Sequence, residues 1–146
     1  MRTRRFSKNL YRKIFGKKRR REISELSTSR IHQSVLRAIA TAPAMPSGGD
    51  HLDVGSGTGE LLRLVGARCP FRSFGCDYTD KLVSVPGTRI DTVDLNHQPL
   101  PYSDNRFALV TCIETIEHLE NYRETIREIF RVLQPGASQC SQPRIF

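Results

Sequence analysis

The chain has 146 residues, of which 38% are hydrophobic, a size and composition that fit one domain with its own core. It contains no run of about 18 apolar residues, so we expect no transmembrane helix, and its basic start lacks the apolar segment of a secretory signal peptide. The net charge of +8 comes from residues 1–21, which hold 11 Lys and Arg and no acid. The other residues hold 12 bases and 15 acids, which argues against nucleic-acid binding by the whole fold.

Residues 1–21 predict a basic helical arm. Phe6, Leu10 and Ile14 recur at i, i+4 and i+8 and form an apolar stripe on an otherwise cationic helix. Such a helix can lie on an anionic membrane surface, contact a nucleic-acid backbone, or remain a solvated tail. The membrane surface is favoured over nucleic acid, and the solvated tail stays open.

A second helix is predicted in residues 22–41, where apolar residues recur at helical spacing from Ile23 to Ile39. We expect this helix to pack on the domain that follows it. Residues 41–50, TAPAMPSGGD, contain two prolines and two glycines and therefore predict a linker.

The main domain is expected at residues 50–136, where short apolar strands alternate with helices. The predicted strands are residues 51–54, 72–77, 88–94 and 106–113, and the predicted helices are residues 58–68 and 122–133. On the last helix the residues expected to face the core are Ile126, Ile129, Phe130 and Leu133. Alternation of this kind favours a parallel sheet with right-handed connections.

The sequence HLDVGSGTGELLRL at residues 51–64 places three glycines between a predicted strand and a predicted helix. Gly55 can adopt a backbone conformation closed to other residues, Gly57 lets a ligand approach the main chain, and Gly59 lets the helix pack near the strand. The dinucleotide fingerprint is GxGxxG, whereas this loop is GxGxG and has Asp53 just ahead of its first glycine. That carboxylate suits an ammonium group better than a pyrophosphate, so the loop predicts a ligand with an amino-acid moiety.

Two further acids, Asp77 and Asp94, close the second and third predicted strands. The carboxyl ends of parallel strands meet at one edge of a sheet, so we expect both acids to lie near Asp53. Asp77 can accept hydrogen bonds from both hydroxyls of a ribose. Asp94 can meet the amino group of adenine while Leu95 covers the ring. One such acid can be a simple cap, but three of them beside a glycine loop predict a nucleoside site.

Several stretches resemble the class I S-adenosylmethionine-dependent methyltransferases of the methyltransferase type 11 kind, namely LDVGSGTGELL, FGCDYT and VDLNHQPLPYSDNRFALVTCIETIEHLENYRETIREIFRVLQPG. The resemblance covers roughly residues 30–136. It implies an α/β fold, a Rossmann-like doubly wound parallel sheet with strand order 3-2-1-4. It also implies that the methionine part of S-adenosylmethionine is held by Asp53, Gly55, Gly57 and Gly59, the ribose by Asp77, and the adenine by Asp94 and Leu95.

The resemblance implies that the segment from Cys112 to Asn121 lines the cavity for cofactor and acceptor. The implied reaction is direct displacement at the sulfonium methyl, which needs alignment more than acid–base help. Where the acceptor must lose a proton, the candidate bases are Glu114, Glu117 and His118. Plain structural roles stay open, since His118 can begin a loop or helix and Glu117 can cap the next helix.

The chain departs from the family pattern at its end. A full family member has seven strands, but ASQCSQPRIF at residues 137–146 lacks strand-like alternation and predicts an irregular tail. We therefore expect strands five to seven to be missing and strand four to be an exposed edge. Truncation is the favoured explanation, ahead of completion by another polypeptide or cover by the basic arm. A truncated chain is expected to bind S-adenosylmethionine weakly and to turn over poorly.

The sequence thus predicts a methyltransferase, or a cofactor-binding fragment of one, that acts on a small-molecule or lipid-like acceptor. The alternative is a non-catalytic Rossmann-like binding module held at a membrane surface or on nucleic acid by its arm, and the glycine spacing disfavours a dehydrogenase. Four scattered cysteines form no CxxC pair and have no His at metal-like spacing, namely Cys69, Cys76, Cys112 and Cys140. We therefore predict no metal site and a cytoplasmic protein, with peripheral membrane contact through residues 1–21 as an option.

Overall fold

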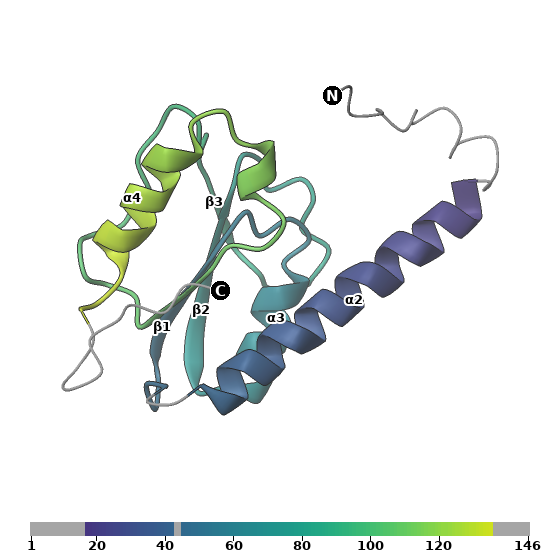
Figure 1. The fold of residues 1–146 in the computed structure, drawn as a ribbon, viewed down its shortest axis with the longest axis horizontal. Coiled ribbons are helices and arrows are strands. Elements are labelled where there is room, and N and C mark those ends of the chain that lie inside the picture. Colours follow the sequence, from purple (N-terminus) through teal and green to yellow (C-terminus); the bar gives the residue numbers. More distant parts are fainter. Residues whose placement is uncertain (1–16, 43–44, 136–146) are drawn as a thin grey trace, which may run out of the picture. The chain divides into compact units, whose positions relative to one another are not determined.

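The computed structural model describes residues 17–42 and 45–135 (Figure 1). The chain divides into two compact units, Met1–Ala38 and Ile39–Phe146. Helix α2 (Lys17–Thr41) begins within the predicted basic arm, so residues 17–21 are helical, while residues 1–16 lie outside the described part. Packing of this helix on the domain stays a prediction. No helix in the described part of the chain is long and apolar enough to cross a membrane.

The second unit is built on a four-stranded parallel sheet with the order β3-β2-β1-β4. Its strands are β1 (Gly49–Val54), β2 (Phe71–Asp77), β3 (Ile90–Thr92) and β4 (Leu109–Thr111). In the central pair, Gly49 lies opposite Phe71 and Val54 opposite Cys76. The predicted sheet, its parallel pairing and its strand order are confirmed. The order reverses between β1 and β4, which is the position where doubly wound sheets bind ligands.

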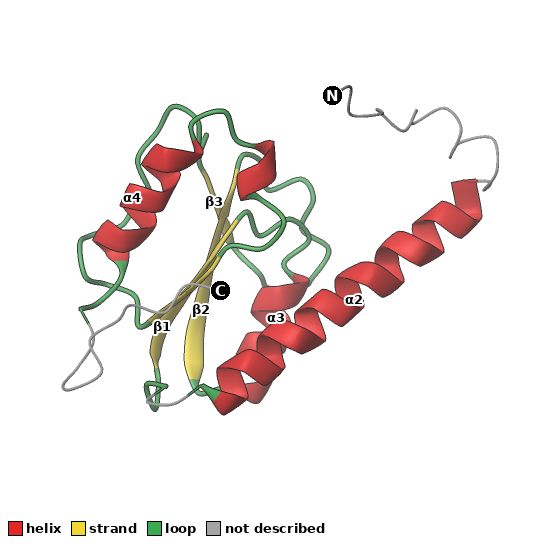
Figure 2. Ribbon diagram, viewed as in Figure 1, coloured by secondary structure: helices red, strands yellow, loops and turns green. Residues whose placement is uncertain are grey.

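Helices cover both faces of this sheet. Figures 1 and 2 show α3 (Glu60–Arg68) and α4 (Tyr122–Val132) on opposite sides of the strands. Because side chains alternate along a strand, the even-numbered residues of β1, Leu52 and Val54, join the core that holds Ile129 and Val132 of α4. The odd-numbered residues of β1 therefore belong to the other face, and they are polar: His51 and Asp53 are both buried.

The element bounds differ locally from those expected. Helix α3 begins at Glu60 rather than at residue 58, because Gly59 has a left-handed backbone with φ of 80° and ends the loop there. Strands β3 and β4 are three residues long each, shorter than the predicted ranges, and residues 78–89 between β2 and β3 form turns and loop. Phe130, expected on the core face of α4, is 52% exposed, since the buried face runs through Thr125, Ile129 and Val132.

Strand β4 is an edge of the four-stranded sheet, as expected, but the chain just before it is paired. Phe107 and Leu133 form a parallel bridge, in which the Phe107 N–H donates to the Val132 carbonyl and the Gln134 N–H donates to the Phe107 carbonyl. The chain leaving α4 therefore runs beside the beginning of the β4 segment. The predicted tail at residues 137–146 lies outside the described residues.

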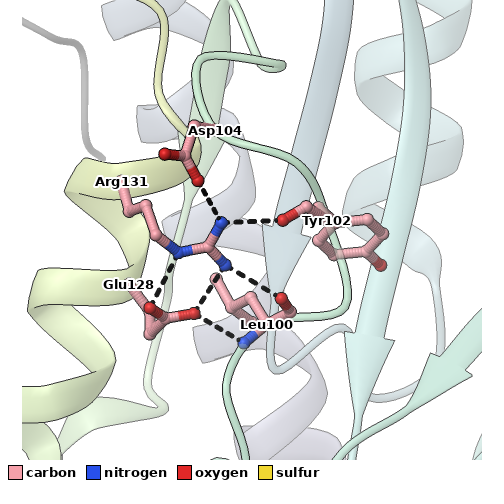
Figure 3. Close-up of polar contacts among 5 residues, drawn as sticks. All are labelled: Leu100, Tyr102, Asp104, Glu128 and Arg131. Carbon is pink, nitrogen blue, oxygen red and sulfur yellow. Dashed lines mark hydrogen bonds and ion pairs between the residues drawn. The ribbon is translucent and has the colours of Figure 1, made fainter.

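Arg131 links α4 to the loop that precedes β4 by hydrogen bonds (Figure 3). Its guanidinium donates to both carboxylate oxygens of Glu128, at 2.8 and 2.7 Å, and to Asp104 at 2.7 Å. It also donates to the carbonyls of Tyr102 and Leu100, and the Leu100 N–H donates to Glu128 in turn. The planar fork of arginine suits this arrangement, which joins a helix to a loop by charge-assisted hydrogen bonds.

Candidate functional site

The glycine loop leaves β1 with three left-handed residues, Gly55 (φ 79°), Gly57 (φ 52°) and Gly59 (φ 80°). At Gly55 a side chain has no room, because an added Cβ would collide with Thr115. At Gly57 an added Cβ would meet nothing within 4 Å, so the main chain there faces open space. The first position is thus needed for packing, whereas the second leaves room for a ligand.

Asp77, at the end of β2, holds the glycine loop directly. Its Oδ2 accepts the Gly57 N–H at 2.8 Å and its Oδ1 accepts the Tyr78 N–H at 2.7 Å. Each carboxylate oxygen has two lone pairs, so both retain acceptor capacity for a further donor. The predicted neighbourhood of Asp77 and the loop is present in the structure.

A cavity of about 510 Å³ lies at the carboxyl ends of the strands. Cavities of this size accommodate small ligands and cofactors. The residues that line it come from the glycine loop, the loops after β2 and β3, and the segment after β4: Gly55, Asp77, Tyr78, Leu82, Asp94, Leu95, Asn96, Glu114, Thr115, His118 and Leu119.

Six of the ten predicted site residues line this cavity. They are Gly55, Asp77, Asp94, Leu95, Glu114 and His118. The lining does not include Asp53, Gly57, Gly59 or Glu117. The segment after β4, which was expected to face the cavity, does so through Glu114, Thr115, His118 and Leu119.

The side chains that line the cavity are mostly acidic where they carry a charge. Among the described residues that line the cavity there are three carboxylates, Asp77, Asp94 and Glu114, and no Lys or Arg, and His118 is the one basic side chain. A pyrophosphate would find no cation there, whereas a positively charged ligand would find three anions. Within residues 17–42 and 45–135, no group of three His, Cys, Asp or Glu could hold a metal ion.

Asp94 does not close β3, which ends at Thr92, but lies in the following turn. Its carboxylate accepts the Asn96 N–H at 3.0 Å and contacts His97 Nδ1 at 2.9 Å. These contacts, that of His97 first, lower the pKa of Asp94 below its ordinary value, so it is ionised at neutral pH. The contact with His97 thus helps to hold the orientation of the Asp94 side chain.

The segment after β4 contains a strained residue at the cavity wall. Glu114 has φ of 52°, in the left-handed region that residues other than glycine seldom adopt. Thr115 beside it donates to the Ile113 carbonyl at 3.0 Å and packs against Gly55. His118 follows in the short helix η1 (Ile116–His118), and both Glu114 and His118 are exposed. An exposed acid and an exposed imidazole therefore face the cavity from one short segment.

Asp53 occupies a different environment from the one expected. It is 3% exposed, and its Oδ1 accepts a hydrogen bond of 2.6 Å from the Thr111 hydroxyl on β4. Burial raises the pKa of Asp53 to about 7, the Thr111 hydrogen bond opposes this rise, and the charge of Asp77 adds to it. Asp53 therefore lies beneath the glycine loop as a buried carboxyl that titrates near neutral pH.

Three residues of the site region were missed at the level of sequence. Asn96 joins two walls, because its side-chain oxygen accepts the N–H groups of Glu120 and Asn121, at 2.9 and 3.1 Å. His51 and Thr111 contact each other at 2.9 Å on the polar face of the sheet. For His51 and Thr111 the sequence offers one indication, a polar residue within an otherwise apolar strand, in HLDV and in ALVTCI.

The parallel sheet, the helices on both faces and the cavity at the strand ends place the protein among Rossmann-like α/β proteins. Residues 52–140 match the methyltransferase domain family. Because this match covers more than half of the chain, the chain belongs to that family, and the predicted resemblance to class I S-adenosylmethionine-dependent methyltransferases is confirmed.

Individual relatives agree with this assignment. The chain is 34% identical over 110 residues to a protein of Mycolicibacterium smegmatis named as a probable S-adenosylmethionine-dependent methyltransferase, a match covering 73% of this chain and 41% of the relative. It is 30% identical over 83 residues to the demethylmenaquinone methyltransferase of Listeria welshimeri, covering 49% of this chain and 35% of the relative. The chain thus spans less than half the length of these two relatives.

Solved structures show the same fold. An S-adenosylmethionine-dependent methyltransferase from Mesorhizobium loti superimposes with a TM-score of 0.56 at 22% identity, covering 70% of this chain and 48% of that one. At this level of identity the likeness supports the fold alone.

Proposed function

We propose that the chain binds S-adenosylmethionine in the 510 Å³ cavity and forms the cofactor-binding part of a methyltransferase. The observation that carries this proposal is the charge of the lining, three carboxylates without Lys or Arg among the described lining residues. S-adenosylmethionine carries a sulfonium and an ammonium group, so an anionic cavity attracts it, whereas a dinucleotide would bring an unfavourable pyrophosphate. The GxGxG spacing of the loop supports the same choice.

The residues present fit the parts of this cofactor. Gly55 at the cavity wall and the open space over Gly57 would accommodate the methionine part. Asp53 lies beneath the loop and outside the cavity lining, so it would act on the ammonium group through its charge. Asp77 would accept the ribose hydroxyls with its remaining lone pairs. Asp94 and Leu95, on the wall formed by the loop after β3, would hold the adenine.

The bound cofactor would supply an electrophilic methyl group. The chain's own contribution is to hold the reacting partners in line and to exclude water, which can be worth about 7–11 kcal/mol in favourable cases. Where an acceptor must lose a proton, Glu114 and His118 would take it, a role supported by their place in the cavity lining. Glu117, the third candidate, is exposed and outside the lining, which makes it the weakest of the three.

The acceptor is proposed to be a small or lipid-like molecule. The name of one relative, a demethylmenaquinone methyltransferase, supports a lipid-like acceptor of the quinone type. Contact of residues 1–21 with a membrane surface, or with nucleic acid, stays a prediction, as does a cytoplasmic location. The activity of the whole protein is likewise a proposal, because the chain covers only part of the length of its relatives.

Calorimetry on the 146-residue chain tests the proposal with three ligands, S-adenosylmethionine, S-adenosylhomocysteine and NAD. We expect the first two to bind and NAD not to bind. The Asp94→Asn variant should weaken binding roughly tenfold, because it removes one charged hydrogen-bond acceptor. The matched control is Asp80→Asn, an exposed acid outside the lining, which should bind as the unaltered chain does. Binding of NAD, or of no adenosyl ligand at all, would contradict the proposal.

A further inference from the structure

Four polar side chains form a continuous hydrogen-bonded chain beneath the glycine loop. His51 Nδ1 lies 3.0 Å from Ser73 Oγ, His51 Nε2 lies 2.9 Å from Thr111 Oγ1, and Thr111 Oγ1 lies 2.6 Å from Asp53 Oδ1. His51 and Thr111 are fully buried, and Asp53 nearly so. We call these four residues the Ser73–Asp53 relay.

The register of the sheet creates the relay. His51 lies directly opposite Ser73 on β2, and Asp53 lies directly opposite Thr111 on β4. His51 reaches Thr111 along the diagonal between β1 and β4. Because all four residues are at alternate positions, their side chains share one face of the sheet, the face opposite to that of Leu52 and Val54.

When Asp53 is ionised, every proton in the relay has one possible position. A carboxylate only accepts, so the Thr111 hydroxyl donates to Asp53, and Thr111 Oγ1 then accepts from His51 Nε2–H. Burial lowers the pKa of His51 to about 4, so the imidazole is neutral and carries a single N–H. His51 Nδ1 therefore accepts from the Ser73 hydroxyl.

When Asp53 is protonated, the same four contacts can run in the opposite direction. The Asp53 carboxyl donates to Thr111, Thr111 donates to His51 Nε2, and His51 Nδ1–H donates to Ser73. The two states differ by one proton. In going from the protonated to the ionised state, the proton of Asp53 passes to Thr111, that of Thr111 passes to His51 Nε2, and that of His51 Nδ1 passes to Ser73. The Ser73 hydroxyl releases its own proton, so one proton leaves the relay in total.

We propose that the Ser73–Asp53 relay reverses its direction as Asp53 gains or loses a proton, so that the tautomer of His51 reports whether Asp53 carries the negative charge that would attract the ammonium group of a ligand. The relay makes His51, Thr111 and Ser73 positioning residues for Asp53. The link to ligand binding rests on the function proposed above, whereas the reversal itself is a property of the free protein.

The surroundings of Asp53 place this change near neutral pH. Burial raises the pKa of Asp53 to about 7, and Asp77 on β2 contributes in the same direction. Cys76 on β2 and Cys112 after β4 also feel the charge of Asp53, and burial raises the pKa of both thiols, so both stay neutral. Glu117 adds its charge at Cys112. The charge that acts on the pKa of Asp53 is that of Asp77, an anion, so a ligand ammonium group would oppose it and stabilise the Asp53 anion.

The Ser73 end of the relay lies at a different cavity from the one beside the glycine loop. Ser73 is only partly buried and lines a second cavity of about 570 Å³, whose wall also includes Arg63, Arg89 and Arg106. The relay therefore connects the carboxyl beneath the glycine loop to this second cavity, lined by three arginines and Asp91, that shares no lining residue with the first. A proton leaving Asp53 has an exit that a ligand in the first cavity does not block.

Imidazole ¹⁵N NMR on the histidine-labelled 146-residue chain tests the reversal without any ligand. We expect the Nδ1–H tautomer of His51 at about pH 5.5 and the Nε2–H tautomer at about pH 8, with a midpoint near the pKa of Asp53. In Asp53→Asn the tautomer should not change over this range. A tautomer of His51 that is independent of pH, or that changes equally in Asp53→Asn, would overturn the proposal.

Calorimetry with S-adenosylhomocysteine tests the link to binding. Affinity should fall about tenfold for each pH unit below the pKa of Asp53, with one proton released per ligand bound. Thr111→Val removes the hydroxyl and should weaken binding about tenfold at pH 7 and move the midpoint upward, whereas Thr111→Ser should restore both. A merely structural role of Thr111 would weaken binding equally at every pH.

The two experiments separate two kinds of failure. If the tautomer changes with pH but S-adenosylhomocysteine does not bind, the relay stands and the proposed ligand is wrong. If the ligand binds with an affinity that does not vary between about pH 5.5 and 8, the ionisation of Asp53 does not govern binding, and the proposed link between the relay and the ligand is wrong. Thr111→Ser and the unaltered chain keep the test decisive should Thr111→Val fail to fold.

Discussion

Replacing Arg131 by Ala should remove the main polar link between α4 and the loop before β4. The substitution deletes five hydrogen bonds, two to Glu128, one to Asp104 and two to the carbonyls of Tyr102 and Leu100. Asp104 is largely exposed, so the loss of its hydrogen bond should cost little stability. The Glu128 side chain is only 15% exposed, and after the substitution it retains the hydrogen bond from the Leu100 N–H.

The expected loss of unfolding free energy is about 2–4 kcal/mol. Hydrogen bonds to charged groups contribute about 1.5–3 kcal/mol each when buried, and the 30% exposure of Arg131 lets water replace part of that. Arg127→Ala is the matched control, since Arg127 also pairs with an acid three residues earlier, Glu124, at 2.7 Å. That pair is exposed, so its loss should cost at most about 0.5 kcal/mol.

Urea titration followed by circular dichroism measures both variants and Arg131→Lys, which keeps the charge but not the fork and should lie between them. The pKa of Glu128 is lowered, chiefly by Arg131, so the stabilisation is present above the ordinary value of 4.5 and is lost as the pH falls through the lowered value. The gap between the unaltered chain and Arg131→Ala should therefore narrow in acid. Equal urea midpoints for Arg131→Ala and Arg127→Ala would refute the reasoning.

Two further predictions concern the glycine loop and the carboxyl group of Asp53 beneath it. Gly57→Ala should fold with a loss of about 1–2 kcal/mol in unfolding free energy, because only its left-handed φ is unfavourable, yet it should bind S-adenosylhomocysteine poorly. Gly55→Ala should be far less stable, because its Cβ collides with Thr115. Thermal unfolding measures the stability of both variants, and calorimetry measures their binding. Asp53→Asn should stabilise the fold by about 2–4 kcal/mol at pH 8, since a carboxyl with a raised pKa opposes folding once it ionises, and this gain should shrink as the pH falls toward 4. A stability gain for Asp53→Asn that is unchanged with pH would argue against a buried carboxyl that titrates near 7.

The sequence predicted those features that depend on local spacing. Glycines at alternate positions between an apolar strand and a helix identified the glycine loop. Asp77 and Asp94 were selected because each was expected at the carboxyl end of a strand, at one edge of a parallel sheet. Both line the cavity, as expected. The strand order followed from the family resemblance carried by these motifs, and the sheet confirms it.

Features that depend on distant partners could not be predicted. Asp53 was expected to contact the ligand, but it is buried, and its Oδ1 accepts a hydrogen bond from the hydroxyl of Thr111 on another strand. The bridge between Phe107 and Leu133 likewise depends on where α4 returns the chain. His51 has an ordinary place in the sequence, and only the register of three strands shows that it joins Ser73 to Thr111.

The pairing of Asp53 with Thr111 has a consequence for the order of folding. These two residues are 58 positions apart, whereas His51 and Ser73 are 22 apart. Contacts across longer loops carry a larger closure entropy and tend to form later. A chain that has assembled β1, α3 and β2 but not yet docked β4 would hold Asp53 as an ordinary carboxylate in water. The buried environment of Asp53 therefore forms only when β4 docks, and the Ser73–Asp53 relay is complete only from that point.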